Sequence, residues 1–159
     1  MYRIGQSSDI HQLIKGRKLI LGGVEIENEY GLLGHSDADA LLHAISEAII
    51  GAMAMGDLGK FFPDNDPKYK GINSIEILKG VNEIMVLNNY SIVNIDSLIM
   101  IEQPKMAPHI EEMKNNISTC LNIDNSLVNV KATRGEGIGF VGRSEGVLAQ
   151  ACVMLKKEI

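Results

Sequence analysis

Two spacings of hydrophobic residues recur along this chain and predict its secondary structure. Short apolar or alternating runs, which are typical of strands, cover residues 2–6, 18–22, 24–26, 91–102, 127–132 and 146–156. The first run continues into Asp9-Ile10-His11, where we expect that strand to end. The run 91–102 alternates and places Val93, Ile95, Ile99 and Ile101 on one face, as expected of a half-buried strand.

Apolar residues at intervals of three and four predict helices in three further segments. They are expected over residues 37–55, 74–88 and 108–121. Asp37 or Asp39 would cap the first helix, because a short polar side chain accepts hydrogen bonds from free helical N–H groups. Strands first, then helices, with the sheet resumed between and after them, are typical of an α+β fold. We therefore expect a single mixed sheet with helices packed on one side, formed by one domain over residues 1–159.

Two stretches between these elements carry turn residues and predict loops. Residues 56–71, GDLGKFFPDNDPKYKG, contain three glycines and two prolines, and a loop of this length is more often a lid or binding loop than a simple connector. Residues 135–142 are also rich in glycine and include the pattern G-x-G-x-x-G. In dinucleotide-binding folds a helix follows this pattern, whereas here the following residues alternate like a strand. We therefore reject a dinucleotide-binding fold.

Charge and composition exclude several classes of partner. The formal net charge of -5 argues against nucleic acid, because proteins that bind the phosphate backbone present a basic face. No apolar run reaches the roughly 18 residues of a membrane span, and the N-terminus lacks the apolar core of a secretory signal. The two cysteines, Cys120 and Cys152, form neither a disulfide framework nor a metal-binding spacing. We expect a cytoplasmic protein without a nucleic-acid or membrane partner.

Three of the four histidines lie close to aspartates, and this clustering suggests a metal site. Asp9 and His11 are two residues apart, so both side chains leave the same face of an extended strand. His43 lies on the first predicted helix, which must pack against the sheet. Two imidazoles and one carboxylate leave a coordination position open, as in a catalytic zinc site. The residues alone leave an alternative open, in which these side chains only form structural hydrogen bonds.

Other segments can contact phosphate, and each also has a purely structural interpretation. His35 and Ser36 precede the first helix, where free N–H groups attract anions, although Ser36 could equally be a cap. The glycine-rich loop 135–142, flanked by basic residues, could approach a phosphate closely or form a charged surface turn. Lys105 after Pro104 could hold a phosphate or a ring, or end a strand in solvent.

Five motifs together resemble the 2-C-methyl-D-erythritol 2,4-cyclodiphosphate synthase family of the non-mevalonate isoprenoid pathway. They are D-x-H at 9–11, GLLGHSDADALLHAI at 31–45, GDLGKFFPDNDPKYKG at 56–71, QPKMAPHI at 103–110, and KAT…EGIGFVGRSEG at 131–146. The resemblance extends from Arg3 to about Leu155. Because no cytidylyltransferase domain precedes the motifs, the form expected is the monofunctional one.

The resemblance implies a fold, an assembly and a reaction. Members of this family are homotrimers of α+β subunits with active sites between neighbouring subunits. They act as phosphorus–oxygen lyases on 4-diphosphocytidyl-2-C-methyl-D-erythritol 2-phosphate, and they release the 2,4-cyclodiphosphate and CMP. The chemistry is an intramolecular phosphoryl transfer, so the chain needs no protein nucleophile.

The resemblance also implies a role for each matching residue. Zn²⁺, or another divalent transition metal, would be bound by Asp9, His11 and His43. His35 and Glu136 match catalytic positions, and Glu136 would hold Mg²⁺ or Mn²⁺ on the diphosphate. The other matching positions contact the substrate phosphate (Ser36), the methylerythritol part (Asp57, Gly59, Phe62, Pro63, Asp64, Asp66), the cytidine diphosphate from the adjacent subunit (Pro104, Lys105, Met106, Thr133), or an isoprenoid diphosphate in the central cavity of the trimer (Phe140, Arg143).

One position departs from the family pattern, and two rival functions follow from the same residues. The family commonly has Lys-Ala-Thr-Thr before the glutamate, whereas here Arg134 and Gly135 follow Thr133. Arg134 could pair with phosphate oxygens through two parallel hydrogen bonds, or turn to solvent. The rivals are a metal-dependent phosphoesterase that hydrolyses its substrate, and a trimeric protein that binds isoprenoid diphosphates without catalysis.

Overall fold

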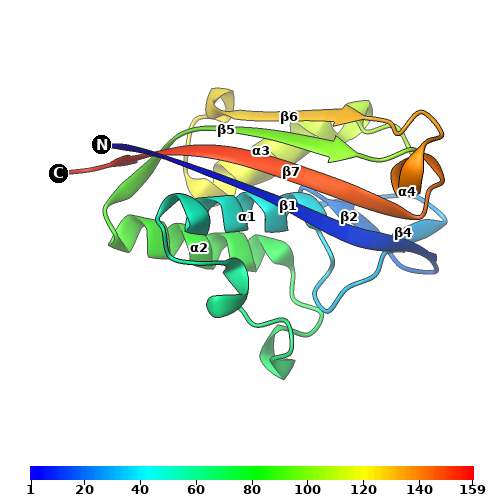
Figure 1. Ribbon diagram of the computed structural model, residues 1–159, viewed down its shortest axis with the longest axis horizontal. Helices are drawn as coiled ribbons and strands as arrows, with labels where there is room; N and C mark the ends of the chain where they lie inside the picture. Colours follow the sequence, from blue (N-terminus) through cyan, green and yellow to red (C-terminus); the bar gives the residue numbers. More distant parts are fainter.

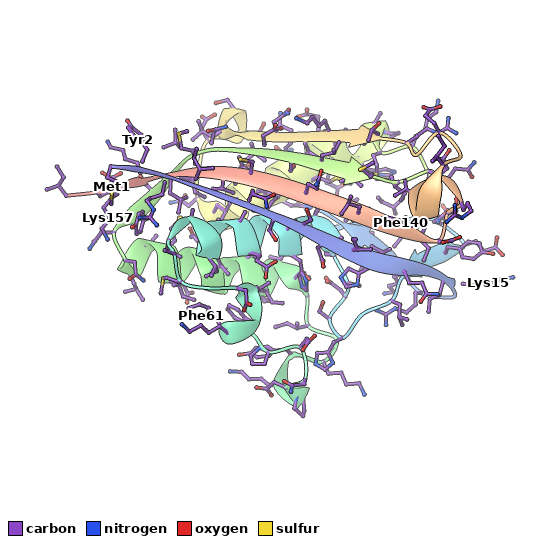
Figure 2. The ribbon with its side chains drawn as sticks, in the orientation of Figure 1. Met1, Tyr2, Lys15, Phe61, Phe140 and Lys157 are labelled. Atoms are coloured by element: carbon purple, nitrogen blue, oxygen red, sulfur yellow. The ribbon has the colours of Figure 1, made fainter.

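The computed structural model describes residues 1–159 and contains a five-stranded sheet in the order β4-β1-β7-β5-β6 (Figure 1). Only β5 and β6 are parallel, so the sheet is mixed, as the sequence predicts. The strands of this sheet are β1 (Tyr2–Lys15), β4 (Tyr30–Leu32), β5 (Tyr90–Met100), β6 (Val128–Thr133) and β7 (Gly146–Lys157). The two chain termini lie side by side at one end of the sheet, and Phe140 and Lys15 lie at the opposite end (Figure 2).

Strand β1 is much longer than the predicted run 2–6, and it continues past His11 instead of ending there. It pairs with β7 from Tyr2 to Gln12, and then with β4 from Leu13 to Lys15. The prediction of a short strand was wrong because polar side chains do not interrupt the backbone ladder. Strand β4 was not predicted, since a three-residue strand shows no periodicity.

Two further corrections concern the sheet. Strands β2 (Leu19–Leu21) and β3 (Val24–Ile26) form a separate two-stranded sheet, so the expectation of a single sheet was wrong. In β5 the pairing with β7 shifts between Ile92 and Asn94. This irregularity turns Ile92 into the core in place of the predicted Val93, whereas Ile95 and Ile99 are buried as expected.

Three helices of at least twelve residues cover one face of the sheet (Figure 1). They are α1 (Ala40–Ala52), α2 (Ser74–Leu87) and α3 (Ile110–Leu121). Helix α1 packs directly on β1 and β7, while α2 lies against α1, and α3 lies near β6. Helix α1 ends three residues before the predicted Met55, because Ala54 adopts a left-handed conformation with φ 59°. Helix α3 begins after a 3₁₀ turn, Ala107–His109, instead of at Pro108. None of the helices is long and apolar enough to span a membrane.

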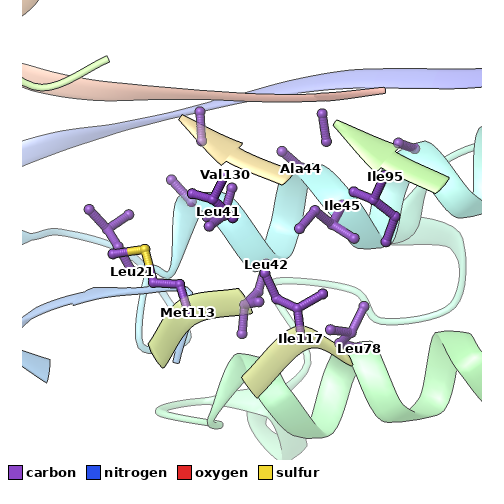
Figure 3. Packing of buried hydrophobic residues seen from close by; sticks show 14 of the residues in the cluster. Leu21, Leu41, Leu42, Ala44, Ile45, Leu78, Ile95, Met113, Ile117 and Val130 are labelled. Atoms are coloured by element: carbon purple, nitrogen blue, oxygen red, sulfur yellow. The ribbon is translucent and has the colours of Figure 1, made fainter. Parts of the chain in front are cut away.

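The core lies between these helices and the sheet, and α1 is buried on most sides (Figure 3). Leu41, Leu42 and Ile45 are all fully buried. Helix α1 approaches β1 closely at Gly5. A Cβ added there would lie 2.7 Å from the backbone nitrogen of Ala52, and closer still to the carbonyl oxygen of Ala48. Only glycine allows this approach, which sets how near α1 lies to the strand that carries Asp9 and His11.

Both predicted loops contain short helical turns. Residues 56–71 include 3₁₀ turns at Leu58–Lys60 and Pro67–Tyr69, which are capped by Asp57 and Asp66. In the glycine-rich segment the structure has a four-residue helix, α4 (Gly139–Gly142), where we expected only a loop. Strand β7 follows it, consistent with the rejection of a dinucleotide-binding fold.

Candidate metal centre and adjoining cavities

Asp9, His11 and His43 converge, which confirms the spatial prediction made from their spacing. One potential ligand atom from each side chain lies within 4.8 Å of the other two. Asp9 Oδ2 is 2.9 Å from His11 Nε2 and 3.6 Å from His43 Nδ1. The imidazoles meet edge to face, with ring centroids 6.1 Å apart and an interplanar angle of 64°. The strand β1 and the helix α1 therefore bring two nitrogens and one carboxylate oxygen to one point.

The hydrogen bonding of the three residues fits a bound cation. Asp9 Oδ2 and His11 Nε2 are buried from solvent, and neither makes a well-aligned hydrogen bond despite their short separation. The other ring nitrogen of each histidine has a partner: His11 Nδ1 lies 2.8 Å from Leu33 O, and His43 Nε2 lies 3.4 Å from Ser36 Oγ. Such outer contacts orient the rings of metal-binding histidines, so this group of residues can hold a metal ion.

The electrostatics of the two histidines differ. Burial lowers the pKa of His43 from its ordinary value, and the Asp9 carboxylate offsets this only in part. For His11, burial also acts to lower the pKa, but the adjacent Asp9 carboxylate, the Leu33 carbonyl and the charge of Asp39 together outweigh it and the pKa is raised. Asp9 therefore attracts positive charge to this point, whether that charge is a proton on His11 or a cation.

The start of helix α1 is held by Asp39, which is fully buried. Its carboxylate accepts hydrogen bonds from the backbone N–H groups of Gly22, Gly23 and Leu42, at 3.0, 2.7 and 3.0 Å. Asp39 therefore caps α1, and it also ties the turn between β2 and β3 to the first turn of the helix that carries His43. Burial raises the pKa of Asp39 to about 7, against the effect of its hydrogen-bond donors.

A small cavity of about 80 Å³ adjoins the candidate metal centre. His43 lines it, so the cavity and the metal centre share a side chain. Of the other residues predicted to bind substrate, His35, Ser36, Phe62 and Asp64 also line it. The cavity lies between the segment before α1 and the loop 56–71, as expected for a binding loop.

The loop 56–71 is attached at several points around this cavity. His35 Nε2 lies 3.0 Å from Asp66 O, and Gly71 N donates to His35 O at 2.8 Å. At the other end of the loop, Glu47 accepts from Leu58 N at 3.3 Å and from Ser7 Oγ at 2.6 Å. Glu47 lies one turn after His43 on the predicted helix, but no role in the site was predicted for it.

A second cavity, of about 230 Å³, contains the predicted cytidine-binding residues Pro104, Lys105, Met106 and Thr133. It also contains Arg134 and Glu102, and it shares no residue with the cavity at His43. Arg134 Nη2 lies 2.9 Å from Glu102 Oε1. Glu102 was not identified from the sequence, because nothing local marks a glutamate at the end of a strand as part of a site.

The remaining predicted residues lie outside these two cavities. Asp57 and Asp66 cap 3₁₀ turns, and the exposed Gly59 lies within the first of these turns. Pro63 and the exposed Glu136 line neither cavity. Phe140 shares a separate surface pocket with His11, and Arg143 Nε is paired with Glu145 Oε1 at 2.7 Å. Within one chain, the structure therefore joins the metal centre to only part of the predicted substrate site.

Comparison with known proteins gives matches over nearly the whole chain. Residues 2–156 match the YgbB family. A protein of Chloroherpeton thalassium named 2-C-methyl-D-erythritol 2,4-cyclodiphosphate synthase is 56% identical over 155 residues, which are 98% of this chain and 99% of that protein. The bifunctional IspDF of Campylobacter jejuni has a similar structure, with a TM-score of 0.95 and 38% identity, and the match covers 99% of this chain and 43% of that one. IspF of Plasmodium falciparum in complex with CDP matches with a TM-score of 0.87 and 34% identity, over 99% of this chain and 97% of that one.

Proposed function

The chain belongs to the YgbB family, and on that premise we propose that it catalyses the reaction for which its relatives are named, the formation of 2-C-methyl-D-erythritol 2,4-cyclodiphosphate. The observation that carries the proposal is the convergence of Asp9, His11 and His43 beside a cavity. The whole chain would act as one synthase domain in non-mevalonate isoprenoid biosynthesis. As CMP leaves while a ring forms, the enzyme would be a phosphorus–oxygen lyase.

The reaction is an intramolecular substitution at phosphorus. An oxygen of the 2-phosphate of 4-diphosphocytidyl-2-C-methyl-D-erythritol 2-phosphate attacks the β-phosphorus, and the bond from that phosphorus to the oxygen bridging the α-phosphate breaks. CMP takes the electrons of that bond and departs. Because both reacting groups belong to one molecule, the chain supplies orientation and charge neutralisation, and an effective molarity of about 10⁵ M or more is attainable.

Asp9, His11 and His43 would hold Zn²⁺ or another divalent transition metal, and the buried, unpaired atoms Asp9 Oδ2 and His11 Nε2 fit this role. When bound, the metal supplies a Lewis acid for the β-phosphate. The contacts of His11 with Leu33 O and of His43 with Ser36 Oγ would keep both rings oriented.

The cavity at His43 would receive the methylerythritol part of the substrate. His35 and Ser36 line it just before the N-terminus of α1, where N–H groups favour a phosphate. Phe62 and Asp64 come from the opposite wall, with an apolar ring for carbon atoms and a carboxylate that can accept bonds from hydroxyl groups. Asp57, Gly59, Pro63 and Asp66 would shape this wall, since they belong to the same loop.

The second cavity would take the cytidine diphosphate. Its lining combines apolar side chains, which suit a flat ring, with the cationic Lys105 and the hydroxyl of Thr133, which would contact the phosphates. The relative from Plasmodium falciparum forms a complex with CDP, and this supports a cytidyl ligand here. Glu136 forms no ion pair and would hold Mg²⁺ or Mn²⁺ on the diphosphate.

We propose a homotrimer in which the two cavities of one active site come from neighbouring subunits. Two observations support it: the cavities share no residue, and the sheet face away from the helices exposes the large apolar side chains Ile4 and Ile10. Phe140 and Arg143 would then line a central cavity able to hold an isoprenoid diphosphate.

The decisive experiment is to measure CMP release from the cytidyl substrate, with and without a chelator. We expect CMP and the cyclodiphosphate in equal amounts, and loss of both after metal removal. Free phosphate in place of the cyclic product would favour the rival phosphoesterase. Absence of CMP together with intact binding of isoprenoid diphosphate would favour a binding protein.

A further inference from the structure

Arg134 lies on the wall of the second cavity and is joined there to a nearly buried carboxylate. The side chain of Glu102 is only 9% exposed, whereas that of Arg134 is 61% exposed. Glu102 Oε1 accepts from Arg134 Nη2 at 2.9 Å, and Glu102 Oε2 accepts from Gly135 N at 2.8 Å. Each oxygen of Glu102 thus has a separate partner on the segment that follows β6.

This arrangement fixes the guanidinium and leaves most of its donors free. The hydrogen bond from Arg134 lowers the pKa of Glu102, so the pair stays charged at neutral pH. A guanidinium carries five N–H donors on three nitrogens, and Glu102 contacts only one of these nitrogens, Nη2. The exposed remainder of Arg134 lies at the same cavity as the Lys105 ammonium and the Thr133 hydroxyl. Glu102 contacts only one side of the Arg134 guanidinium, so Arg134 and Lys105 can both still contact an anion in the cavity.

The chemical nature of the cavity selects a ligand with an apolar body and adjacent negative charge. Ile101, Met106 and Ile110 supply apolar surface, and the cationic groups belong to the same lining. A nucleoside diphosphate has this division between a flat base and a charged end. A guanidinium binds phosphate oxygens through parallel hydrogen bonds, which a hydroxyl such as that of threonine cannot form.

We propose that Arg134 is a specificity-determining residue that binds the diphosphate of the cytidyl ligand, and that Glu102 is the positioning residue that orients it. This inference rests on the function proposed above. With Arg134 in place of the threonine of the Lys-Ala-Thr-Thr pattern, the phosphates of the ligand should contribute more to its affinity than they would with a threonine.

The test compares the affinities of cytidine, CMP and CDP by calorimetry, using zinc-loaded protein without added Mg²⁺. We expect Arg134→Ala and Arg134→Thr to weaken CDP binding by about 10- to 100-fold, the loss typical of a charged hydrogen bond, and to leave cytidine binding unchanged. Arg134→Lys keeps the charge without the fork and should lose less. Because Arg134 is exposed, these variants should fold.

Lys15→Ala provides the matched control, because Lys15 is also an exposed cation in an ion pair, at 3.0 Å from Glu29, and lines neither cavity. It should bind all three ligands as the parent does. Parental affinity of Arg134→Thr for CDP would overturn the proposal. Equal weakening of cytidine and CDP would also overturn it, because the ion pair would then only tie two segments of the wall together.

The role of Glu102 is tested by a double-mutant cycle. Glu102→Gln retains an oxygen for Gly135 N but lacks the charge that holds the guanidinium. It should weaken CDP binding when Arg134 is present and have no further effect in the Arg134→Ala background. Equal weakening in both backgrounds, or none in either, would overturn the positioning role. Since these measurements need no turnover, failure to release CMP would refute the proposed function separately.

Discussion

Substituting Gly5 by alanine should disturb the fold and the metal centre together. Gly5 lies on β1 and faces α1. A Cβ at this position would lie 2.7 Å from Ala52 N and 2.9 Å from the carbonyl carbon of Ala48, and closer still to the oxygen of that carbonyl. These are backbone atoms of a helix, so no side chain can rotate away to make room.

The size of the effect follows from the overlap. Ordinary contacts of a carbon with an oxygen begin at about 3.3 Å, so α1 must move outward by more than about 1 Å. Overpacking of this kind costs about 1–3 kcal/mol of stability, or more where only backbone can move. The same movement separates His43 on α1 from Asp9 and His11 on β1, whereas metal–ligand distances must be met within about 0.2 Å. Metal affinity should therefore fall about tenfold or more.

Two measurements test this reasoning, with Gly51→Ala as the matched control. Gly51 lies on the same helix, and an added Cβ would meet no heavy atom within 4 Å. Urea unfolding of the metal-free proteins should show Gly5→Ala destabilised and Gly51→Ala stabilised by about 0.5–1 kcal/mol, the usual gain of alanine over glycine in a helix. Competition with a chromophoric chelator gives the zinc affinities. The reasoning is refuted if Gly5→Ala unfolds at the parental urea concentration and binds zinc as tightly as the parent.

Three further predictions concern single side chains. His43→Ala should lose bound metal and turnover while its circular dichroism stays that of the parent; an unchanged zinc content by elemental analysis would remove His43 from the ligand set. Glu136→Gln should retain zinc but require more Mg²⁺ for activity, and superimposable Mg²⁺ titrations for variant and parent would contradict this role. Because burial raises the pKa of Asp39 to about 7, the folded state holds a proton that the unfolded state releases near pH 4. Its contribution to stability is complete below that pH and is lost as the pH rises through 7. The free energy of unfolding of the parent, minus that of Asp39→Asn, should therefore fall by roughly 1 kcal/mol per pH unit between pH 5 and 7; a difference that rises with pH would show that the three N–H donors outweigh burial.

Local patterns predicted most elements of this fold because they depend on the period of the backbone. Helices α1, α2 and α3 appear near their predicted positions, and the strands β5, β6 and β7 do so as well. The errors occurred where distant segments decide the outcome. Strand β1 extends to Lys15 because β7 and then β4 supply partners for its polar half. The shift within β5 likewise depends on its pairing with β7.

The candidate site divides in the same way. The sequence by itself determined that Asp9 and His11 share a face, because side chains alternate along a strand, and that His43 belongs to a helix with apolar residues at helical spacing. Only the tertiary structure decided that these side chains meet, since their separation depends on the contact of Gly5 with α1. The pairing of Glu102 with Arg134 joins residues 32 positions apart and was equally invisible. The spacing of residues along the chain determines which face of a helix or strand each side chain leaves. The distance between side chains on different elements depends on how all the elements pack together.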